Sequence, residues 1–126
     1  MQELKTSRDF FALAIEKFQR KNYPEAINAF KRSLTLHEDW ESYKGLGFAL
    51  SFTQQYQSAI EAFNKSLTLH EDWQSYKGLG WVLFNTHQHQ PAIEAFNKSL
   101  ALHEDWETYQ GLGLALLHTQ QHQPAI

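Results

Sequence analysis

The sequence predicts an all-α protein, an α-solenoid built from helix–turn–helix repeats. The segment LHEDW occurs three times, at 36–40, 69–73 and 102–106, with a spacing of 33 residues each time. Apolar residues recur at helical spacing within each copy, and no segment shows the alternation that marks a strand. Repeats of this length are typical of solenoids, in which each repeat buries its apolar face against its neighbours.

The 126 residues are predicted to form one solenoid domain, 1–126, of three complete repeats and part of a fourth. The complete repeats span 7–39, 40–72 and 73–105. Residues 106–126 supply the first helix and the start of the second helix of the fourth repeat. The first copy is the most diverged, whereas the others are nearly identical. We therefore expect most residues to serve packing, because every copy faces the same packing problem.

Each repeat is predicted to contain two helices joined by a turn. In the second repeat Asp39 suits an N-cap, and the polar stretch 53–55 marks the turn. In the third and fourth repeats Pro91 and Pro124 stand in the first turn of the second helix, where the missing N–H is not needed. The apolar face of the first helix in the second repeat consists of Tyr43, Leu46, Gly47 and Leu50, and that of the second helix of Ala59, Ile60, Phe63, Ser66 and Leu67.

The six glycines all lie in GLG triplets, at 45–47, 78–80 and 111–113, inside predicted first helices. A glycine within a helix costs about 1 kcal/mol relative to alanine. We infer that another helix approaches these positions too closely for a side chain to fit. A dinucleotide-binding loop is the alternative for G-x-G, but it requires a preceding strand and a third glycine, which this sequence lacks.

The repeat resembles the tetratricopeptide repeat family. The family's W-x2-L-G-x2-Y stretch corresponds to Tyr43-x2-Leu46-Gly47-x2-Leu50 and its copies, and its A-x3-F to Ala59-x3-Phe63 and Ala92-x3-Phe96. This 33-residue variant is one residue short. The resemblance implies a right-handed α-solenoid and a noncatalytic protein–protein interaction scaffold. Departures fall at the joint between repeats, with Glu38, Glu71 and Glu104 at the usual proline and Ser33, Ser66 and Ser99 at a small residue of the second helix.

The repeated LHEDW segment raises the question of a metal site. His37, His70 and His103 are one repeat apart, and packed helices lie about 8–10 Å from each other, so the three imidazoles cannot share one ion. One histidine with two adjacent carboxylates also gives few well-directed ligands. We favour a joint in which histidine and glutamate lie in a solvated turn, aspartate caps the next helix and tryptophan covers the joint. No metal and no cofactor are expected.

A second stripe of each first helix lies roughly opposite the second helix of its repeat. The resemblance places this stripe on a concave groove that binds partner segments, so we expect an apolar or amphipathic protein or peptide there. The alternative is that its large apolar residues pack between successive first helices. The residues predicted to line the groove are Phe11, Phe18, Lys44, Phe48, Phe52, Lys77, Trp81, Phe84 and Leu114.

The fourth repeat lacks most of its second helix, which leaves Leu112 and Leu116 without their expected partner. We expect either a fragment of a longer protein or self-association through this end, because uncapped repeats pair readily. A homo-oligomer is therefore one alternative to the scaffold. Another is a docking module of a larger enzyme, since similar repeats precede transferases in some bacterial proteins.

Composition excludes several classes of protein. The formal net charge of −3 offers no basic excess for nucleic acid, and the absence of cysteine excludes disulfides and thiolate chemistry. No apolar run is long enough to span a membrane, and the first 20 residues are not a secretory signal, so we expect a cytoplasmic protein. No nucleophile–base motif, phosphate loop or carboxylate pair is evident, so we expect no enzyme activity and no catalytic residues.

Overall fold

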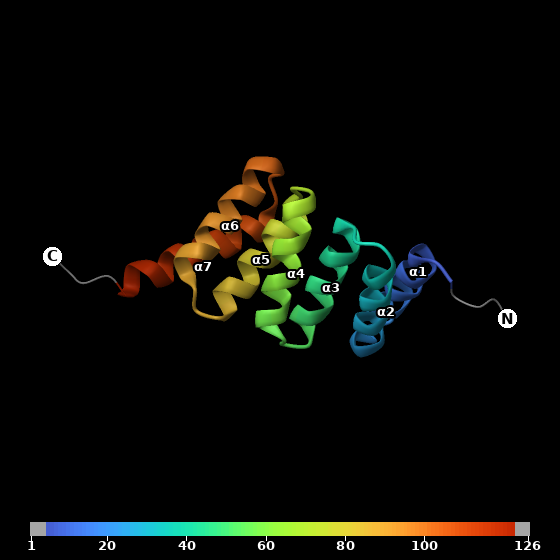
Figure 1. The fold of residues 1–126 in the computed structure, drawn as a ribbon. Coiled ribbons are helices and arrows are strands. Elements are labelled where there is room, and N and C mark those ends of the chain that lie inside the picture. The colour runs from blue at the N-terminus through green and yellow to red at the C-terminus, as the bar shows by residue number, and fades with distance from the viewer. Residues whose placement is uncertain (1–4, 123–126) are drawn as a thin grey trace. The chain divides into compact units, whose positions relative to one another are not determined.

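The computed structural model describes residues 5–122, which form seven helices and no strand (Figure 1). An N-terminal body ends at His70 and a C-terminal body begins at Glu71. The predicted all-α helical-repeat fold is confirmed. The helices are α1 (Ser7–Gln19), α2 (Tyr23–Leu36), α3 (Trp40–Phe52) and α4 (Tyr56–Leu69) in the N-terminal body, and α5 (Trp73–Asn85), α6 (His89–Leu102) and α7 (Trp106–His122) in the C-terminal body.

The first helices of the second, third and fourth repeats begin where the sequence predicts. The carboxylates of Asp39, Asp72 and Asp105 accept hydrogen bonds from the backbone N–H three residues further on, at 2.8, 3.1 and 3.1 Å. In the diverged first repeat Thr6 takes this role in a reciprocal capping box with Asp9. Each cap satisfies an N–H that has no partner within the helix, which fixes where the helix begins.

The turns between paired helices contain a residue in the left-handed region, with φ of 62° at Lys21, 62° at Gln54 and 64° at His87. This conformation costs a residue other than glycine about 1–2 kcal/mol. It lets the next N–H reach back to the preceding helix, as when Gln55 donates to the carbonyl of Leu50 at 2.9 Å. The second helix then folds back against the first.

Pro91 lies in the first turn of α6, as predicted, whereas Pro124 lies outside the described residues. The last described helix differs from its counterparts. By analogy with 53–55, a turn is expected at 119–121, but α7 continues as helix to His122.

A phenylalanine from each second helix forms the centre of each repeat. Phe30, Phe63 and Phe96 are fully buried. A methyl carbon placed on Gly47 would lie 2.8 Å from the ring of Phe63, and one on Gly80 would lie 2.6 Å from the ring of Phe96. The second glycine of each of these triplets therefore provides the space that the ring of its own repeat occupies, which confirms the predicted close approach.

In α3 and α7 the first glycine of the triplet faces the ring of the preceding repeat. A methyl carbon on Gly45 would overlap the ring of Phe30, and one on Gly111 would lie 2.6 Å from the ring of Phe96. Phe96 is thus held between the glycines of α5 and α7. Gly113 is the exception, because no atom lies within 4 Å of a methyl carbon placed there.

The serines of the second helices explain one departure from the family pattern. Ser33, Ser66 and Ser99 are fully buried. Each hydroxyl donates a hydrogen bond of 2.8 Å to the carbonyl of the residue that begins its own repeat's first helix. A buried hydroxyl without a partner would be costly, so these bonds set the register of the two helices in each repeat.

We predict that Gly45→Ala lowers the free energy of unfolding by about 1–3 kcal/mol, because the added methyl group overlaps Phe30. The ring of Phe30 is fully buried and Phe11 packs edge-on to it, so the ring has little room to shift. The matched change Gly113→Ala should instead raise the free energy by up to about 1 kcal/mol, because the methyl group meets open space in a helix. Urea denaturation followed by circular dichroism compares the two. Equal effects would contradict this account of the glycines.

Candidate functional site

The LHEDW segment forms the joint between repeats, with each residue in a separate role. Aspartate caps the next helix, as described above, and tryptophan begins that helix. The indole of Trp40 lies against the imidazole of His70 with ring centroids 4.4 Å apart, and Trp73 stacks on His103 at 4.1 Å. The tryptophan of one joint thus contacts the histidine of the next. His70 and His103 thus pack against an indole, and each belongs to a different joint.

Glutamate holds the joint where the family pattern has proline. The phenol of Tyr43 donates a hydrogen bond to Glu38, Tyr76 donates to Glu71 at 2.8 Å, and Tyr109 donates to Glu104 at 3.1 Å. This bond to the Glu38 carboxylate, together with burial and the nearby negative charge, raises the pKa of Tyr43 to about 12. The glutamate therefore ties the loop to the helix that follows it.

Three further histidines gather in the C-terminal body around Phe84. The rings of His87 and His89 are 6.0 Å apart, and those of His89 and His118 are 5.2 Å apart. Within residues 5–122, no group of three or more histidine or carboxylate side chains is arranged to hold a metal ion.

No helix of the described part of the chain is long and apolar enough to cross a membrane.

Three of the predicted groove residues make packing contacts with a second helix. Phe11 packs edge-on to Phe30 at 6.1 Å between ring centroids. Phe48 meets Phe63 at 5.0 Å, and Trp81 meets Phe96 at 5.5 Å, in the same edge-on manner. All three groove residues are partly exposed. They extend the core to the surface. These ring contacts are with the second helix of their own repeat, so the prediction that this part of the stripe lies opposite the second helix is wrong for these three rings, and the contacts are not the predicted ones between successive first helices.

The two predicted groove lysines lie over the tryptophans that begin their helices. The ammonium group of Lys44 is 4.9 Å from the ring of Trp40, and that of Lys77 is 5.7 Å from the ring of Trp73. Lys77 also forms ion pairs with Asp105 at 2.9 Å and Glu107 at 3.3 Å. These hydrogen bonds and charges outweigh burial and raise the pKa of Lys77. Its charge is already neutralised within the C-terminal body.

An aromatic group, here termed the Phe52 cluster, consists of Phe18, Tyr23 and Phe52 on the N-terminal body. Phe52 stacks on Tyr23 with centroids 5.0 Å apart, and Phe18 lies 5.5 Å from Tyr23 and 5.8 Å from Phe52. Phe52 is 57% exposed although it is large and apolar. Tyr23 is not among the predicted groove residues, because it begins a second helix and the predicted stripe lies on first helices alone.

The same three positions come together in the C-terminal body as the Phe84 cluster, which consists of Phe84, His89 and His118. Each of its members lies 66 residues after its counterpart in the Phe52 cluster. Phe84 is 5.4 Å from His89 and 5.2 Å from His118, both edge-on. Two imidazoles thus replace the tyrosine and the exposed phenylalanine, which makes this copy more polar.

The predicted end residues lie on α7. Leu116 is 43% exposed, whereas the equivalent Leu50 and Leu83 are at most 8% exposed. Leu112 is partly exposed, and the nearby groove residue Leu114 is 37% exposed. Trp106, which begins the helix, is 78% exposed. The repeated sequence thus presents to solvent on α7 a face that it buries on α3 and α5.

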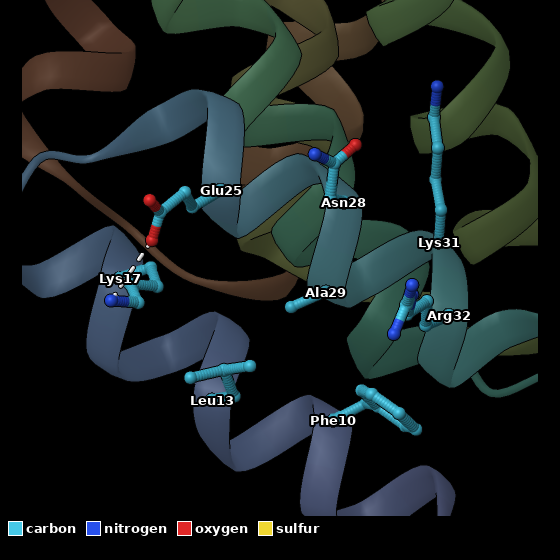
Figure 2. A pocket seen from close by; sticks show the side chains of 8 residues that line it. All are labelled: Phe10, Leu13, Lys17, Glu25, Asn28, Ala29, Lys31 and Arg32. Carbon is cyan, nitrogen blue, oxygen red and sulfur yellow. Dashed lines mark ion pairs between the residues drawn. The ribbon is translucent and has the colours of Figure 1, made fainter. Parts of the chain in front are cut away.

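A groove of about 570 Å³ lies between α1 and α2 of the N-terminal body (Figure 2). Phe10, Leu13 and Ala29 supply its apolar lining. Lys17 pairs with Glu25 at 3.0 Å at one end, and the guanidinium of Arg32 lies 5.7 Å over the ring of Phe10 at the other. This groove is not among the predicted sites. The signal was available, because Lys17 replaces the leucine that later copies have at this position.

The chain was compared with known proteins. The family model for the tetratricopeptide repeat matches residues 11–76, more than half of the chain. No sequence match was found among curated proteins. The solved structure of MamA is 26% identical with a TM-score of 0.87, and the match covers 90% of this chain and 68% of that one.

Two less similar structures share the fold. The first TPR of Spaghetti (RPAP3), solved bound to the HSP90 peptide SRMEEVD, is 14% identical with a TM-score of 0.89, and the match covers 94% of this chain and 96% of that one. The Sgt2 TPR domain from Aspergillus fumigatus is 16% identical with a TM-score of 0.84, covering 100% of this chain and 92% of that one.

We predict that Glu38→Gln lowers the pKa of Tyr43 from about 12 towards the ordinary tyrosine value, because the bond to the carboxylate is its largest cause. A raised pKa means that the stabilisation is complete below about pH 10 and is lost as the pH rises towards 12. Absorbance at 295 nm during alkaline titration measures the change. Glu41→Gln, an exposed change in the same repeat, is the control and should leave the tyrosine titration unaltered.

We also predict that Trp106 dominates the quenching of tryptophan fluorescence by acrylamide, because it is 78% exposed whereas Trp40, Trp73 and Trp81 are partly covered. Trp106→Phe should remove the most readily quenched component. Trp73→Phe should leave that component in place. The reverse result would show that the face around Trp106 is covered in solution.

Proposed function

The chain belongs to the tetratricopeptide repeat family, and from that premise we propose that it is a noncatalytic scaffold that binds an apolar or amphipathic peptide segment of a partner protein. A family fold alone does not assign a ligand, so the surface has to supply the argument. We assign the binding surface to the predicted groove residues together with the two aromatic clusters, each considered on its own body.

The observation that carries this proposal is the Phe52 cluster. Phe52 is 57% exposed and is held in place by two neighbouring rings, one of which stacks on it at 5.0 Å. A ring that is already fixed loses little side-chain freedom when a ligand covers it, and aromatic residues supply much of the binding energy of protein interfaces. Exposed neighbouring apolar side chains of this kind usually mark an interaction site.

Charge at the predicted groove favours an apolar ligand over an acidic one. Lys77 is engaged by Asp105 and Glu107, so an acidic peptide would have to displace two carboxylates to reach it. The Spaghetti domain, which has the same fold, was solved with a peptide, and this supports a peptide as the class of ligand here. The glycines and aromatic side chains of this chain favour an apolar or amphipathic one.

Within the surface, we expect the predicted residues to divide into two roles. Phe11, Phe48 and Trp81 contact the central phenylalanines, so their loss should affect stability as well as binding. Phe52 lies four residues after Phe48, and Phe84 lies three residues after Trp81, which is about one helical turn in each case. A ligand can cover these two rings without disturbing the core. A binding test should therefore use the second pair.

We predict that apolar peptides selected from a 12-residue library on the wild-type chain bind Phe52→Ala at least about tenfold more weakly, since a buried aromatic anchor contributes about 2 kcal/mol or more. Fluorescence anisotropy of the labelled peptide measures the affinity. Leu36→Ala removes a similarly exposed apolar residue, at 54%, from the end of α2, and is the matched control.

Unchanged binding by both Phe52→Ala and Phe84→Ala, in variants that keep the wild-type helical signal, would rule out the aromatic clusters as the binding surface. Light scattering on the same samples tests the alternative of self-assembly. A wild-type mass that rises with concentration and falls to a monomer in Phe52→Ala would assign the surface to a second copy.

A further inference from the structure

The Phe84 cluster places two histidine rings at positions where the N-terminal body has a tyrosine and a phenylalanine. The rings of His89 and His118 lie 5.2 Å apart and are tilted by 33°. Each of them also contacts Phe84 edge-on, at 5.4 and 5.2 Å between ring centroids. All three side chains are partly exposed. The cluster is therefore a surface of one apolar ring and two titratable rings.

The surroundings of His118 identify the nitrogen that takes up a proton. Its Nδ1 lies 2.9 Å from the carbonyl oxygen of Leu114. A carbonyl oxygen only accepts hydrogen bonds, so Nδ1 carries the hydrogen of the neutral ring and Nε2 is the basic nitrogen. Protonation at Nε2 adds a positive charge to the ring while this hydrogen bond stays in place.

Histidines are the titratable groups in this part of the C-terminal body. His87, in the turn before α6, adds a third imidazole 6.0 Å from His89. The sequence has no aspartate or glutamate within 73–93 or within 108–122. Glu94 follows His89 by five residues, a spacing that does not bring two side chains together on a helix. A proton on one imidazole thus adds charge beside other imidazoles.

The remaining charged groups of α5, α6 and α7 are engaged elsewhere. Lys77 forms ion pairs with Asp105 and Glu107 at the start of α7. The ammonium group of Lys98 lies 5.8 Å from the ring of Tyr76. The protonated cluster therefore depends on water to solvate its charge. An apolar ligand that covers the rings removes this water and favours their neutral form.

We propose that the Phe84 cluster is a pH-sensitive part of the binding surface, which holds an apolar segment while His89 and His118 are neutral and releases it when they are protonated. This inference rests on the function proposed above. Histidine is the side chain that ordinarily titrates between pH 5 and 8. The Phe52 cluster, which has Tyr23 and Phe52 at the two histidine positions, keeps its charge over this range.

The size of the effect follows from the neutral fraction of an ordinary histidine, which falls from about 0.9 at pH 7.5 to about 0.1 at pH 5.5. Apparent affinity falls in proportion to the fraction of chains that is competent to bind. The dissociation constant should therefore rise about tenfold if one imidazole has to be neutral, and further if both have to be.

The test uses the whole chain and 12-residue peptides with blocked ends and without Asp, Glu or His, so that the charge of the peptide is constant between pH 5.5 and 7.5. The peptides are selected from a library at pH 7.5 for binding that Phe84→Ala weakens. Calorimetric titration should show binding to the wild type that is at least about tenfold weaker at pH 5.5 than at pH 7.5.

The matched variant combines His89→Tyr with His118→Phe, which copies the Phe52 cluster onto the C-terminal body. Its affinity should differ by less than about twofold between the two pH values. It keeps the other five of the seven histidines, so an effect of pH on the fold as a whole would persist in it. His87→Gln, an exposed change in the neighbouring turn, should leave the pH dependence in place.

The outcomes separate this inference from the proposed function. If no selected peptide depends on Phe84, the cluster is not a binding surface and both fail. If such peptides bind the wild type equally well or more tightly at pH 5.5, the inference alone is overturned. The same holds if the double variant keeps the pH dependence of the wild type, or if His87→Gln alone removes it.

Discussion

The contact between a phenylalanine ring and a glycine backbone is the constraint on which the repeats depend. Phe96 shows it most fully, because glycines of α5 and α7 lie on two sides of one buried ring. A side chain at either glycine would separate the helices, so the GLG triplet and the phenylalanine must be repeated together. On α3 the two glycines serve different rings, because Gly45 lies against Phe30 of the preceding repeat and Gly47 against Phe63 of its own.

The joint between repeats determines where the next helix begins and in which register it packs. Three directed contacts replace the usual proline. Aspartate caps the helix, glutamate accepts from the tyrosine one turn into it, and the first tryptophan meets the histidine of the next joint. Because the buried serine also bonds to that tryptophan's carbonyl, both ends of a helix pair are tied to one residue, which is compatible with a repeat one residue shorter than usual.

The sequence predicted the helices, their caps and the role of the glycines, because periodicity and capping are local properties. It could not separate Phe48 from Phe52, which lie on one predicted stripe. Phe48 packs against Phe63, and Phe52 is mostly exposed beside Tyr23. Which neighbour covers a residue depends on how the second helix folds back, and that information is not in the spacing of one helix. The groove beside Phe10 differs in this respect, because the change from leucine to Lys17 was visible in the sequence.

Identical residues have different environments in different repeats, so the same residue type is buried in one repeat and exposed in another. Tyr76 and Tyr109 both donate to a glutamate, yet Tyr76 is 8% exposed and Tyr109 is 48% exposed. In the first repeat Lys17, which forms an ion pair with Glu25, stands where the later copies have Leu50 and Leu83. On α7 the same position holds Leu116, which is 43% exposed, compared with 3% at Leu50 and 8% at Leu83. The same position of the repeat thus holds a buried leucine, an exposed leucine or an ion-paired lysine, so its surroundings decide its role and its place in the repeat does not.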